Sequence, residues 1–370
     1  MPINADLLQT AGLEFVAAFS AVVALIFMMQ PFAHRLGLVD KPGGRKDHAD
    51  DTPVTGGLAI AVGTIVPALI LTPPNPQVVG LGVAAVILVI TGVLDDIYDI
   101  PWPIRILAQV AASIAIILIG DVKVENLGPV FGLHRLDLGY LSAPFTVVAT
   151  VGLINALNMI DGIDGLAGSL CLAAVAMLAA ASLYAGNLDL AHGLVVIGGA
   201  VCGFLAFNLR LPWRARARVF LGNAGSAYLG LMIAWAAFRL TQNPGHPVTP
   251  VLAPFLVAPP LIDCLVLIFR RLKHRRSPFH ADRTHVHHLM LDGGFTVTGV
   301  VATLCGASLV LGLVAAIAVR ADTPPSVMML LFVALTGAYF LFTRHPERAI
   351  AAYRRITGGA KAAGQAKTGA

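Results

Sequence analysis

The feature that most limits the fold of this chain is a succession of long apolar runs. A helix needs about 20 mostly apolar residues to cross the hydrocarbon core of a bilayer. With 57% hydrophobic and 12% charged residues, the composition is typical of an integral membrane protein. We therefore expect an all-α polytopic membrane protein. The runs predict eleven membrane-spanning helices, at residues 11–33, 54–72, 78–94, 104–120, 142–157, 166–185, 190–207, 223–240, 248–269, 297–319 and 325–343.

The apolar runs also divide the chain. We expect residues 1–345 to form one membrane-embedded domain and residues 346–370 to form a tail that is disordered at its Gly/Ala/Lys-rich end. Residues 121–140 alternate only weakly and contain Gly and Pro, which favours a short hairpin outside the bilayer. Basic residues follow the first apolar run instead of preceding it, so this run is expected to be a retained helix and not a signal peptide.

The basic residues predict the orientation. Of the 25 Lys and Arg residues, all but Lys123, Arg135, Arg239 and Arg320 fall in the tail or in loops on one side of the predicted helices. Loops rich in Lys and Arg face the cytoplasm. This predicts an N-terminus outside and a cytoplasmic C-terminus. Because these clusters are explained by orientation, we expect no nucleic-acid partner.

The first motif-like segment is DDIYDIP, residues 95–101, at the end of the third predicted helix. Asp95, Asp96 and Asp99 lie together there with one nearby base, Arg105. Adjacent carboxylates repel one another, so such a group favours a bound cation, a shared proton, or both. The simpler alternative is a solvated acidic turn in which an aspartate caps the next helix.

The second segment is NALNMIDGIDGLAG, residues 155–168. Asn158, Asp161 and Asp164 are spaced by three, which places their oxygen atoms on one face of a helix or tight turn. Hard oxygen ligands at a membrane edge suit Mg²⁺, which keeps several waters and bridges substrate phosphates. The glycines permit close approach by a phosphate or another helix. The alternative is that these residues merely begin the next helix.

The third segment is FLGNAGS, residues 220–226, preceded by Arg214, Arg216 and Arg218. Backbone N–H groups at the start of a helix attract phosphate. A short Gly/Ser loop is a weak signal by itself. An ordinary helix start with orientation-setting arginines would explain it equally well.

The fourth segment is SPFHADRTHVHH, residues 277–288, which carries four of the chain's eleven histidines within nine residues. A zinc site and a featureless basic loop are both alternatives, but no Cys accompanies the histidines and their spacing is not HExxH. Anion recognition is the better interpretation. Arg283 can bind a phosphate through two hydrogen bonds, and histidines can donate hydrogen bonds or move protons.

Together these residues resemble a known family. The four motifs, in this order and on one predicted membrane face, resemble those of the polyprenyl-phosphate N-acetylhexosamine-1-phosphate transferases of glycosyltransferase family 4. The loop VDKPGGRKDH, residues 39–48, and Asn208 in GFLAFN fit the same family, and the resemblance runs from about residue 35 to residue 295. The fourth motif resembles the WecA/TagO-like branch, whose members act on UDP-N-acetylglucosamine. The MraY branch, which acts on the cell-wall pentapeptide substrate, carries a different histidine cluster.

The resemblance implies an enzyme of the bacterial inner (cytoplasmic) membrane with its site on the cytoplasmic face. It would transfer N-acetylglucosamine-1-phosphate from UDP-GlcNAc to undecaprenyl phosphate, release UMP and start the synthesis of a lipid-linked surface polysaccharide. The implied cofactor is Mg²⁺, with Mn²⁺ as an alternative, and a homodimer is compatible with the family. The implied catalytic residues are Asp95, Asp96 and Asp161, the metal ligands Asp164 and Asn223, and the substrate-binding residues Lys46, Asn158, Asn208, Phe220, Arg283, His285, His287 and His288.

Position 223 departs from the family pattern, which normally has Asp there. A carboxamide still offers an oxygen to a cation but removes one negative charge. The departure leaves three explanations: a natural variant with compensation, an engineered change, or a member that has lost catalysis and acts as a scaffold.

The sequence also leaves two rival functions open. One is the same chemistry on another UDP-N-acetylhexosamine. The second is a cation-coupled transporter, in which carboxylates are expected near the midplane of the membrane. Only Asp263 is a clear candidate for that position, so the transporter is disfavoured.

Overall fold

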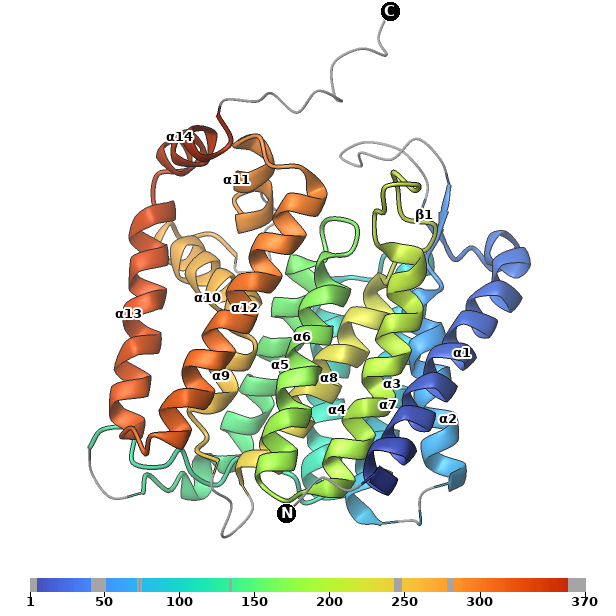
Figure 1. Cartoon of the computed structure of the whole chain (residues 1–370), viewed down its shortest axis with the longest axis horizontal. Helices are drawn as coiled ribbons and strands as arrows, with labels where there is room; N and C mark the ends of the chain where they lie inside the picture. Colours follow the sequence, from blue (N-terminus) through green and yellow to red (C-terminus); the bar gives the residue numbers. More distant parts are fainter. Residues whose placement is uncertain are drawn as a thin grey trace, which may run out of the picture.

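The computed structural model describes residues 5–40, 51–71, 73, 75–132, 135–242, 248–277 and 283–358. These residues form a bundle of long helices (Figure 1). In chain order the elements are α1 (Ala5–Leu36), β1 (Val39–Asp40), β2 (Thr52–Pro53), α2 (Gly56–Leu71), α3 (Pro76–Tyr98), α4 (Trp102–Leu118), the short 3₁₀ helix η1 (Gly139–Leu141), α5 (Ser142–Ile160), α6 (Leu166–Tyr184), α7 (Leu188–Asn208), α8 (Gly222–Thr241), α9 (Leu252–Leu256), α10 (Ala258–Lys273), α11 (Val286–Asp292), α12 (Val297–Arg320), α13 (Pro325–Thr343) and α14 (Pro346–Ile356).

The helices confirm a polytopic membrane protein. Within the described residues, seven helical stretches are long and apolar enough to cross a bilayer: those of α1, α3, η1 with α5, α6, α7, α12 and α13. Two further apolar helices, α2 and α4, are shorter. The number of eleven crossings and the orientation stay predictions.

One predicted span is divided in the structure. The run 248–269 forms two helices, because α9 ends at Leu256 and α10 begins at Ala258. Pro259 and Pro260 follow directly in the first turn of α10. Proline has no backbone N–H and is tolerated in the first turn of a helix but not in its interior, so the pair begins a new helix.

Helix α8 occupies the centre of the bundle. It packs against α2, α3, α5 and α6, and its side chains are buried over most of its length. Glycines permit this close packing at the first turn of α8. A Cβ at Gly57 of α2 would overlap the backbone of Gly225, and one at Gly92 of α3 would overlap the backbone of Ala224. The start of α8 is therefore fixed against two neighbouring helices.

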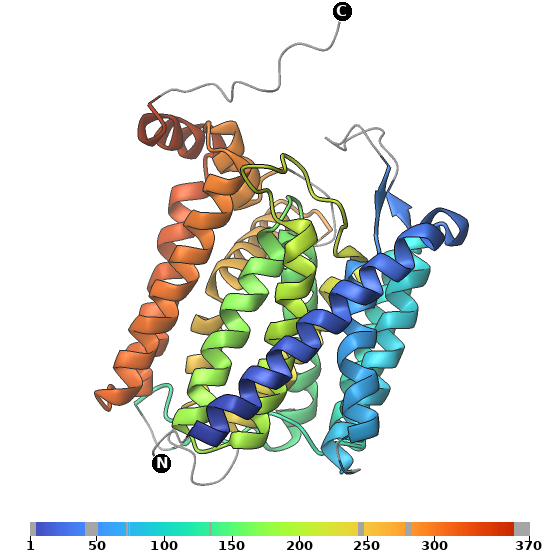
Figure 2. The same ribbon diagram turned by 45° about the vertical axis from the view of Figure 1, so that its right-hand side comes forward.

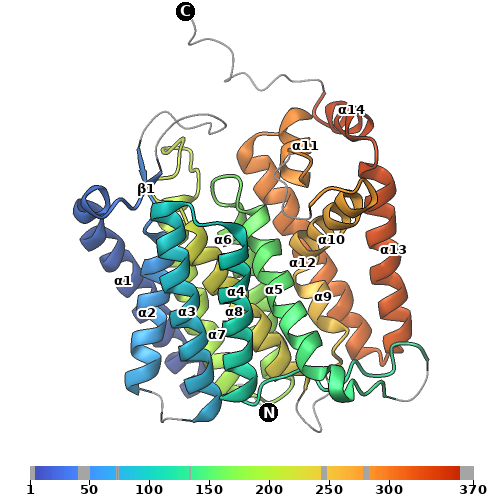
Figure 3. The same ribbon diagram turned by 180° about the vertical axis from the view of Figure 1, so that it is seen from behind.

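The outer helices surround this centre. Helix α1 crosses the bundle at a slant and packs along α7 (Figure 2). Seen from behind, α3, α4, α5 and α10 follow one another across the bundle (Figure 3). We call the end of the bundle that carries β1, α11 and α14 the site end (Figure 1).

Backbone hydrogen bonds join separate segments at the site end. Strands β1 and β2 pair antiparallel, with Val39 opposite Pro53. The Phe220 N–H donates to the Pro53 carbonyl at 2.9 Å, and the Gly57 N–H donates to the Leu221 carbonyl at 2.9 Å. The segment that leads into α8 is thus held on the start of α2.

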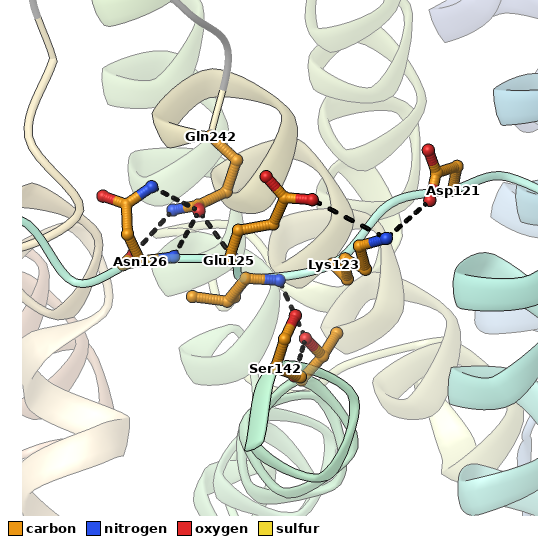
Figure 4. A network of polar contacts seen from close by, with 8 residues as sticks. Asp121, Lys123, Glu125, Asn126, Ser142 and Gln242 are labelled. Atoms are coloured by element: carbon orange, nitrogen blue, oxygen red, sulfur yellow. Dashed lines mark hydrogen bonds and ion pairs between the residues drawn. The ribbon is translucent and has the colours of Figure 1, made fainter. Parts of the chain in front are cut away.

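The opposite end of the bundle carries the connection between α4 and α5. Asn126 and Asp137 form an isolated antiparallel bridge, which confirms the predicted hairpin; its place outside the bilayer stays a prediction. Gln242, just after α8, accepts the N–H groups of Glu125 and Asn126 at 2.8 and 3.1 Å (Figure 4). This contact fixes the hairpin to the end of the central helix.

The tail begins with a helix. Helix α14 lies across the site end at an angle to α13 (Figure 1). Its Tyr353 ring contacts Phe295 and Phe342 with centroid distances of 5.8 and 5.5 Å. The remainder of the predicted tail, from residue 359, lies outside the described residues.

Candidate active site

All four motifs meet at one cavity of about 360 Å³ at the site end. Its walls come from α3, α4, α5, α8, α10 and α11, and from the residues next to them. The polar residues that line it are Thr91, Asp95, Arg105, Gln109, Asn155, Asn158, Asn223, Arg271, His285, His287 and His288. Segments almost 200 residues apart therefore contribute to one site.

Asp95 faces this cavity. It lies in the last turn of α3 and is only 3% exposed. Its Oδ2 accepts a hydrogen bond from Arg105 Nη1 at 3.1 Å. Its Oδ1 is buried and has no hydrogen-bond partner among the residues that the structure describes. A buried carboxylate oxygen without a partner is costly, so this atom is suited to receive a proton, a cation or a ligand donor.

Asp96 is not among the residues that line the cavity, and its carboxylate caps a helix. Its two carboxylate oxygens accept the backbone N–H groups of Asn223 at 2.8 Å and Ala224 at 3.3 Å. N–H groups in the first turn of a helix have no partner within the helix, and a carboxylate there is also favoured by the helix dipole. The alternative that an aspartate of this motif caps a helix therefore holds, but the capped helix is α8. The next helix along the chain, α4, has Pro101 as its N-cap. A catalytic role for Asp96 stays a prediction.

An amide network joins the second motif to the third. Asn158, in the last turn of α5, donates from Nδ2 to Asn223 Oδ1 at 2.8 Å and to Ser226 Oγ at 3.0 Å. Asn158 and Asn223 both line the cavity. The network fixes the carboxamide oxygen of Asn223 at the cavity wall.

Asp161 and Asp164 lie in the turn between α5 and α6. Asp164 Oδ2 accepts hydrogen bonds from Arg210 Nε at 2.7 Å and from the Ala217 N–H at 3.1 Å, so it holds the loop before α8. Burial, together with the charges of Asp96 and Asp164, raises the pKa of Asp161 to about 7. Three carboxylates thus share one electrostatic neighbourhood, which favours a cation.

The residues fit part of a metal site. Within the described part of the chain, no three His, Cys, Asp or Glu side chains form a group that could hold a metal ion. Mg²⁺ does not require such a group, because it keeps several waters and takes one or two carboxylates together with substrate phosphates. Asp161, Asp164 and Asn223 would each offer a side-chain oxygen as a metal ligand, and oxygen is the hard ligand that Mg²⁺ prefers. They fit such a cation chemically, and the metal stays a prediction.

Two predicted substrate-binding residues have structural contacts. Asn208 is buried; it accepts the Gly165 N–H at 2.8 Å and donates to the Val219 carbonyl at 2.9 Å. It joins the second motif to the residue just before the third and is not among the cavity-lining residues. Phe220 is half-buried and also outside the lining, so its role toward uracil stays a prediction. Lys46 lies outside the described residues.

Three histidines of the fourth motif, His285, His287 and His288, line the cavity at the start of α11, and His280 lies outside the described residues. His287 is only 1% exposed, and its ring nitrogens are buried with no hydrogen-bond partner within the described ranges. Its ring lies 4.2 Å from that of His288 and packs on Gly162 of the second motif. Burial, followed by the nearby His288, His285 and Arg283, lowers the pKa of His287 well below its usual range. His287 is therefore a neutral ring. Arg283 itself is exposed and outside the lining.

The structure also brings in residues that the motifs did not include. Arg271 of α10 lines the cavity although it is only 5% exposed. Gln109 of α4 accepts from Asn155 Nδ2 at 2.6 Å, which adds a polar pair to the wall. In the sequence, Arg271 lies in a run of basic residues that predicts orientation alone. Its burial, which only the fold reveals, distinguishes it from its neighbours.

The charges of the lining suit an anionic ligand. Arg105 and Arg271 bring two guanidinium groups to a wall on which Asp95 is the only carboxylate among the lining residues. Guanidinium groups bind phosphate through paired hydrogen bonds. The cavity can therefore receive a phosphorylated substrate beside a carboxylate able to hold a proton, an arrangement that suits phosphoryl transfer.

Comparisons with known proteins agree with this class. The model of glycosyl transferase family 4 matches residues 78–241. The chain is 37% identical over 286 residues to the undecaprenyl-phosphate alpha-N-acetylglucosaminyl 1-phosphate transferase of Haemophilus influenzae, covering 76% of this chain and 79% of that protein. It is 33% identical over 341 residues to the protein of the same name from Escherichia coli K12, covering 90% of each.

The chain belongs to glycosyl transferase family 4. This confirms the family resemblance drawn from the four motifs. A third relative, from Yersinia pestis, carries the same name and is 33% identical over 323 residues, which cover 87% of this chain and 88% of that protein.

Proposed function

We propose that this chain transfers N-acetylglucosamine-1-phosphate from UDP-GlcNAc to undecaprenyl phosphate and so starts a lipid-linked surface polysaccharide. The observation that carries the proposal is the single cavity at which all four motifs meet. Its two arginines and its carboxylate suit two phosphorylated substrates. The names of the relatives from Haemophilus influenzae and Escherichia coli describe the transfer of an N-acetylglucosaminyl 1-phosphate group to undecaprenyl phosphate.

The reaction exchanges one phosphorus–oxygen bond for another. A phosphate oxygen of the lipid attacks the β-phosphorus of UDP-GlcNAc, and the bond from that phosphorus to the bridging oxygen breaks. UMP leaves with the bridging oxygen, and the lipid carries a sugar diphosphate. Such a transfer depends on positioning and charge neutralisation more than on covalent chemistry by the protein.

The cavity side chains have distinct roles in this reaction. Arg105 and Arg271 neutralise phosphate charge, and Arg105 also holds the Asp95 carboxylate in place. The free oxygen of Asp95 accepts the proton of a singly charged lipid phosphate, which makes that phosphate a better nucleophile. His285, His287 and His288 form the wall on which the sugar and diphosphate lie.

A divalent cation would complete the charge balance. Asp161, Asp164 and Asn223 would hold Mg²⁺ or Mn²⁺ beside the cavity. When bound, the cation would neutralise the diphosphate. The mutual repulsion of the carboxylates supports this assignment, because a cation would relieve it.

The proposed setting is the bacterial inner membrane, with the site end at the cytoplasm. The basic residues of the predicted cytoplasmic loops support this orientation. If α2, α4, α8 and the α9–α10 pair cross the bilayer with the seven long helices, the chain crosses eleven times. UDP-GlcNAc would then reach the cavity from the cytoplasm and the lipid from the inner leaflet.

The proposal is tested by UMP release from detergent-solubilised protein. UMP should appear only when both undecaprenyl phosphate and a UDP-sugar are present, and UDP-GlcNAc should be the best donor in a panel that includes UDP-GalNAc. A better reaction with another UDP-N-acetylhexosamine would correct the donor and keep the chemistry. No UMP with any donor, together with ion uptake into proteoliposomes, would favour the transporter.

A further inference from the structure

A buried carboxylate outside the four motifs holds the histidine loop. Asp263 of α10 is 2% exposed, and three donors converge on it. His285 Nδ1 lies 2.8 Å from its Oδ2. The Val286 N–H donates to Oδ1 at 3.0 Å, and the Tyr339 hydroxyl of α13 donates to Oδ1 at 2.5 Å. One side chain thus ties the start of α11 to both α10 and α13.

The carboxylate determines the tautomer of His285. An ionised carboxylate can only accept hydrogen bonds, so the facing Nδ1 must carry a proton. In the neutral ring the proton-free nitrogen is then Nε2. His285 lines the cavity, so the ring offers Nε2 to a ligand there. Carboxylates fix catalytic and metal-binding histidines in the same way.

We propose that Asp263 is a positioning residue for the transfer reaction: it holds His285 as the Nδ1–H tautomer and directs Nε2 to the UDP-sugar. The inference rests on the proposed function for the identity of that ligand. The Tyr339 and Val286 donors share Oδ1, which leaves Oδ2 to His285 among the residues that the structure describes. The carboxylate is therefore oriented so that Oδ1 accepts hydrogen bonds from the Val286 N–H and the Tyr339 hydroxyl, and Oδ2 faces the His285 ring.

The substitution Asp263→Asn tests this role while preserving shape. Asparagine keeps one oxygen for Val286 and Tyr339 and turns an NH₂ group toward His285 Nδ1. The matching neutral ring carries its proton on Nε2, which is the wrong atom for the proposed contact. Tyr339→Phe is the matched control, because it removes one donor and leaves the bond between Asp263 and His285 intact.

A second control comes from another carboxylate–imidazole pair. Glu14 of α1 and His192 of α7 lie 2.6 Å apart, and neither lines the cavity. Glu14→Gln weakens a pair of the same chemistry in the same protein. If carboxylate–imidazole pairs were needed only for folding, Glu14→Gln should lose activity to the same extent as Asp263→Asn.

The kinetic experiment measures UMP release by the full chain at varied UDP-GlcNAc and at varied undecaprenyl phosphate. We expect Asp263→Asn to lower kcat/KM for UDP-GlcNAc by about 10²-fold with little change in the KM for the lipid, by analogy with the loss of an outer partner that orients a metal-binding histidine. The kcat/KM of Tyr339→Phe should stay within about threefold of that of the unmodified chain, and the kcat/KM of Glu14→Gln should equal that of the unmodified chain. Equal losses in Asp263→Asn and Tyr339→Phe would overturn the proposal.

The double variant shows whether Asp263 acts through His285. Residues that act as one unit are not additive. Asp263→Asn combined with His285→Ala should therefore be no slower than His285→Ala alone. A further loss of about 10²-fold in the double variant would mean that Asp263 acts through another group.

A spectroscopic readout separates this inference from the proposed function. In ¹⁵N-histidine-labelled protein, the His285 signal, assigned by its absence in His285→Ala, should show a proton on Nδ1. It should show a neutral ring with the proton on Nε2 in Asp263→Asn. An unprotonated Nδ1 in the unmodified protein overturns the proposal even if Asp263→Asn fails to fold. If the protein transfers nothing from UDP-GlcNAc, this spectrum still decides the role of Asp263.

Discussion

Two neighbouring aspartates show what the sequence predicts at the scale of single residues. The DDIYDIP motif predicts a functional group of carboxylates, and Asp95 does face the cavity. Adjacent residues on a helix point about 100° apart, so the two carboxylates contact different neighbours. Asp96 instead caps α8. This role was not predictable, because it depends on a helix that begins 126 residues later along the chain.

Because Asp95 lines the cavity and Asp96 caps α8, we expect substitutions of Asp95 to lower turnover and substitutions of Asp96 to lower stability. Asp95→Asn should lower the turnover rate by about 10²-fold, because it removes a charge at the cavity. It keeps the packing and loses only an ion pair with the partly exposed Arg105, so the melting temperature should fall less than in Asp96→Ala. Asp96→Ala should destabilise the protein by about 1–2 kcal/mol, and Asp96→Asn should recover most of that stability because Asn also caps helices. Thermal melting and UMP release on the three proteins check this. Asp96→Ala melting like the unmodified chain would contradict the capping role.

The carboxamide at position 223 leads to a second prediction. Asn223→Asp should raise turnover at limiting Mg²⁺ by about tenfold or more, which corresponds to about 1.4 kcal/mol. In metal-free protein the same change should lower the melting temperature, because the Asp96 carboxylate lies against residue 223, whose backbone N–H it accepts, and a second carboxylate there would repel it. Turnover and melting are measured against Mg²⁺ concentration. Identical curves for the two proteins would show that position 223 does not contact the metal.

At the scale of elements, the start of α8 organises the site. It receives the Asp96 cap, carries Asn223 at the cavity wall and packs tightly on α2. The sequence signal is weak here, because FLGNAGS is also an ordinary helix start. The glycines do suggest close approach, but only the fold identifies the partners, which are Gly57 with Gly225 and Gly92 with Ala224.

Close packing at this point predicts an effect of Gly57→Ala. The added methyl group would meet the backbone of Gly225, so α8 must shift, at a cost of about 1–3 kcal/mol. Turnover should fall as well, because the shift moves Asn223. Gly193→Ala in α7 is the control, since a Cβ there meets nothing within 4 Å. Equal melting temperatures for Gly57→Ala and Gly193→Ala would contradict this packing.

The buried ring of His287 on α11 predicts sensitivity to acid. Its pKa lies well below 6.5 in the folded protein and near 6.5 in the unfolded chain. Below about pH 6.5 the unfolded chain therefore binds the extra proton, and stability falls as the pH falls. His287→Asn should reduce the slope of melting temperature against pH between about 6.5 and 5. A slope that is unchanged in His287→Asn would assign the acid sensitivity to other groups.

At the scale of the whole molecule, the hydropathy pattern predicted the helices better than their ends. Each predicted span corresponds to helix in the described residues, but 248–269 is broken at Val257 before the Pro259–Pro260 pair. The distribution of Lys and Arg placed the four motifs on one side. It could not show that Arg271 and Gln109 line the cavity or that Asp263 contacts His285, because these residues lie in apolar or basic runs whose contacts depend on packing between distant helices.

The central claim is that this cavity transfers a sugar together with its phosphate. The most direct test follows a label in the β-phosphate of UDP-GlcNAc given with undecaprenyl phosphate to the purified protein. We predict that the label moves to the lipid fraction, that unlabelled UMP is released in equal amount, and that Asp95→Asn lowers both by about 10²-fold. Label that stays in released UDP while the sugar alone reaches the lipid would contradict the account.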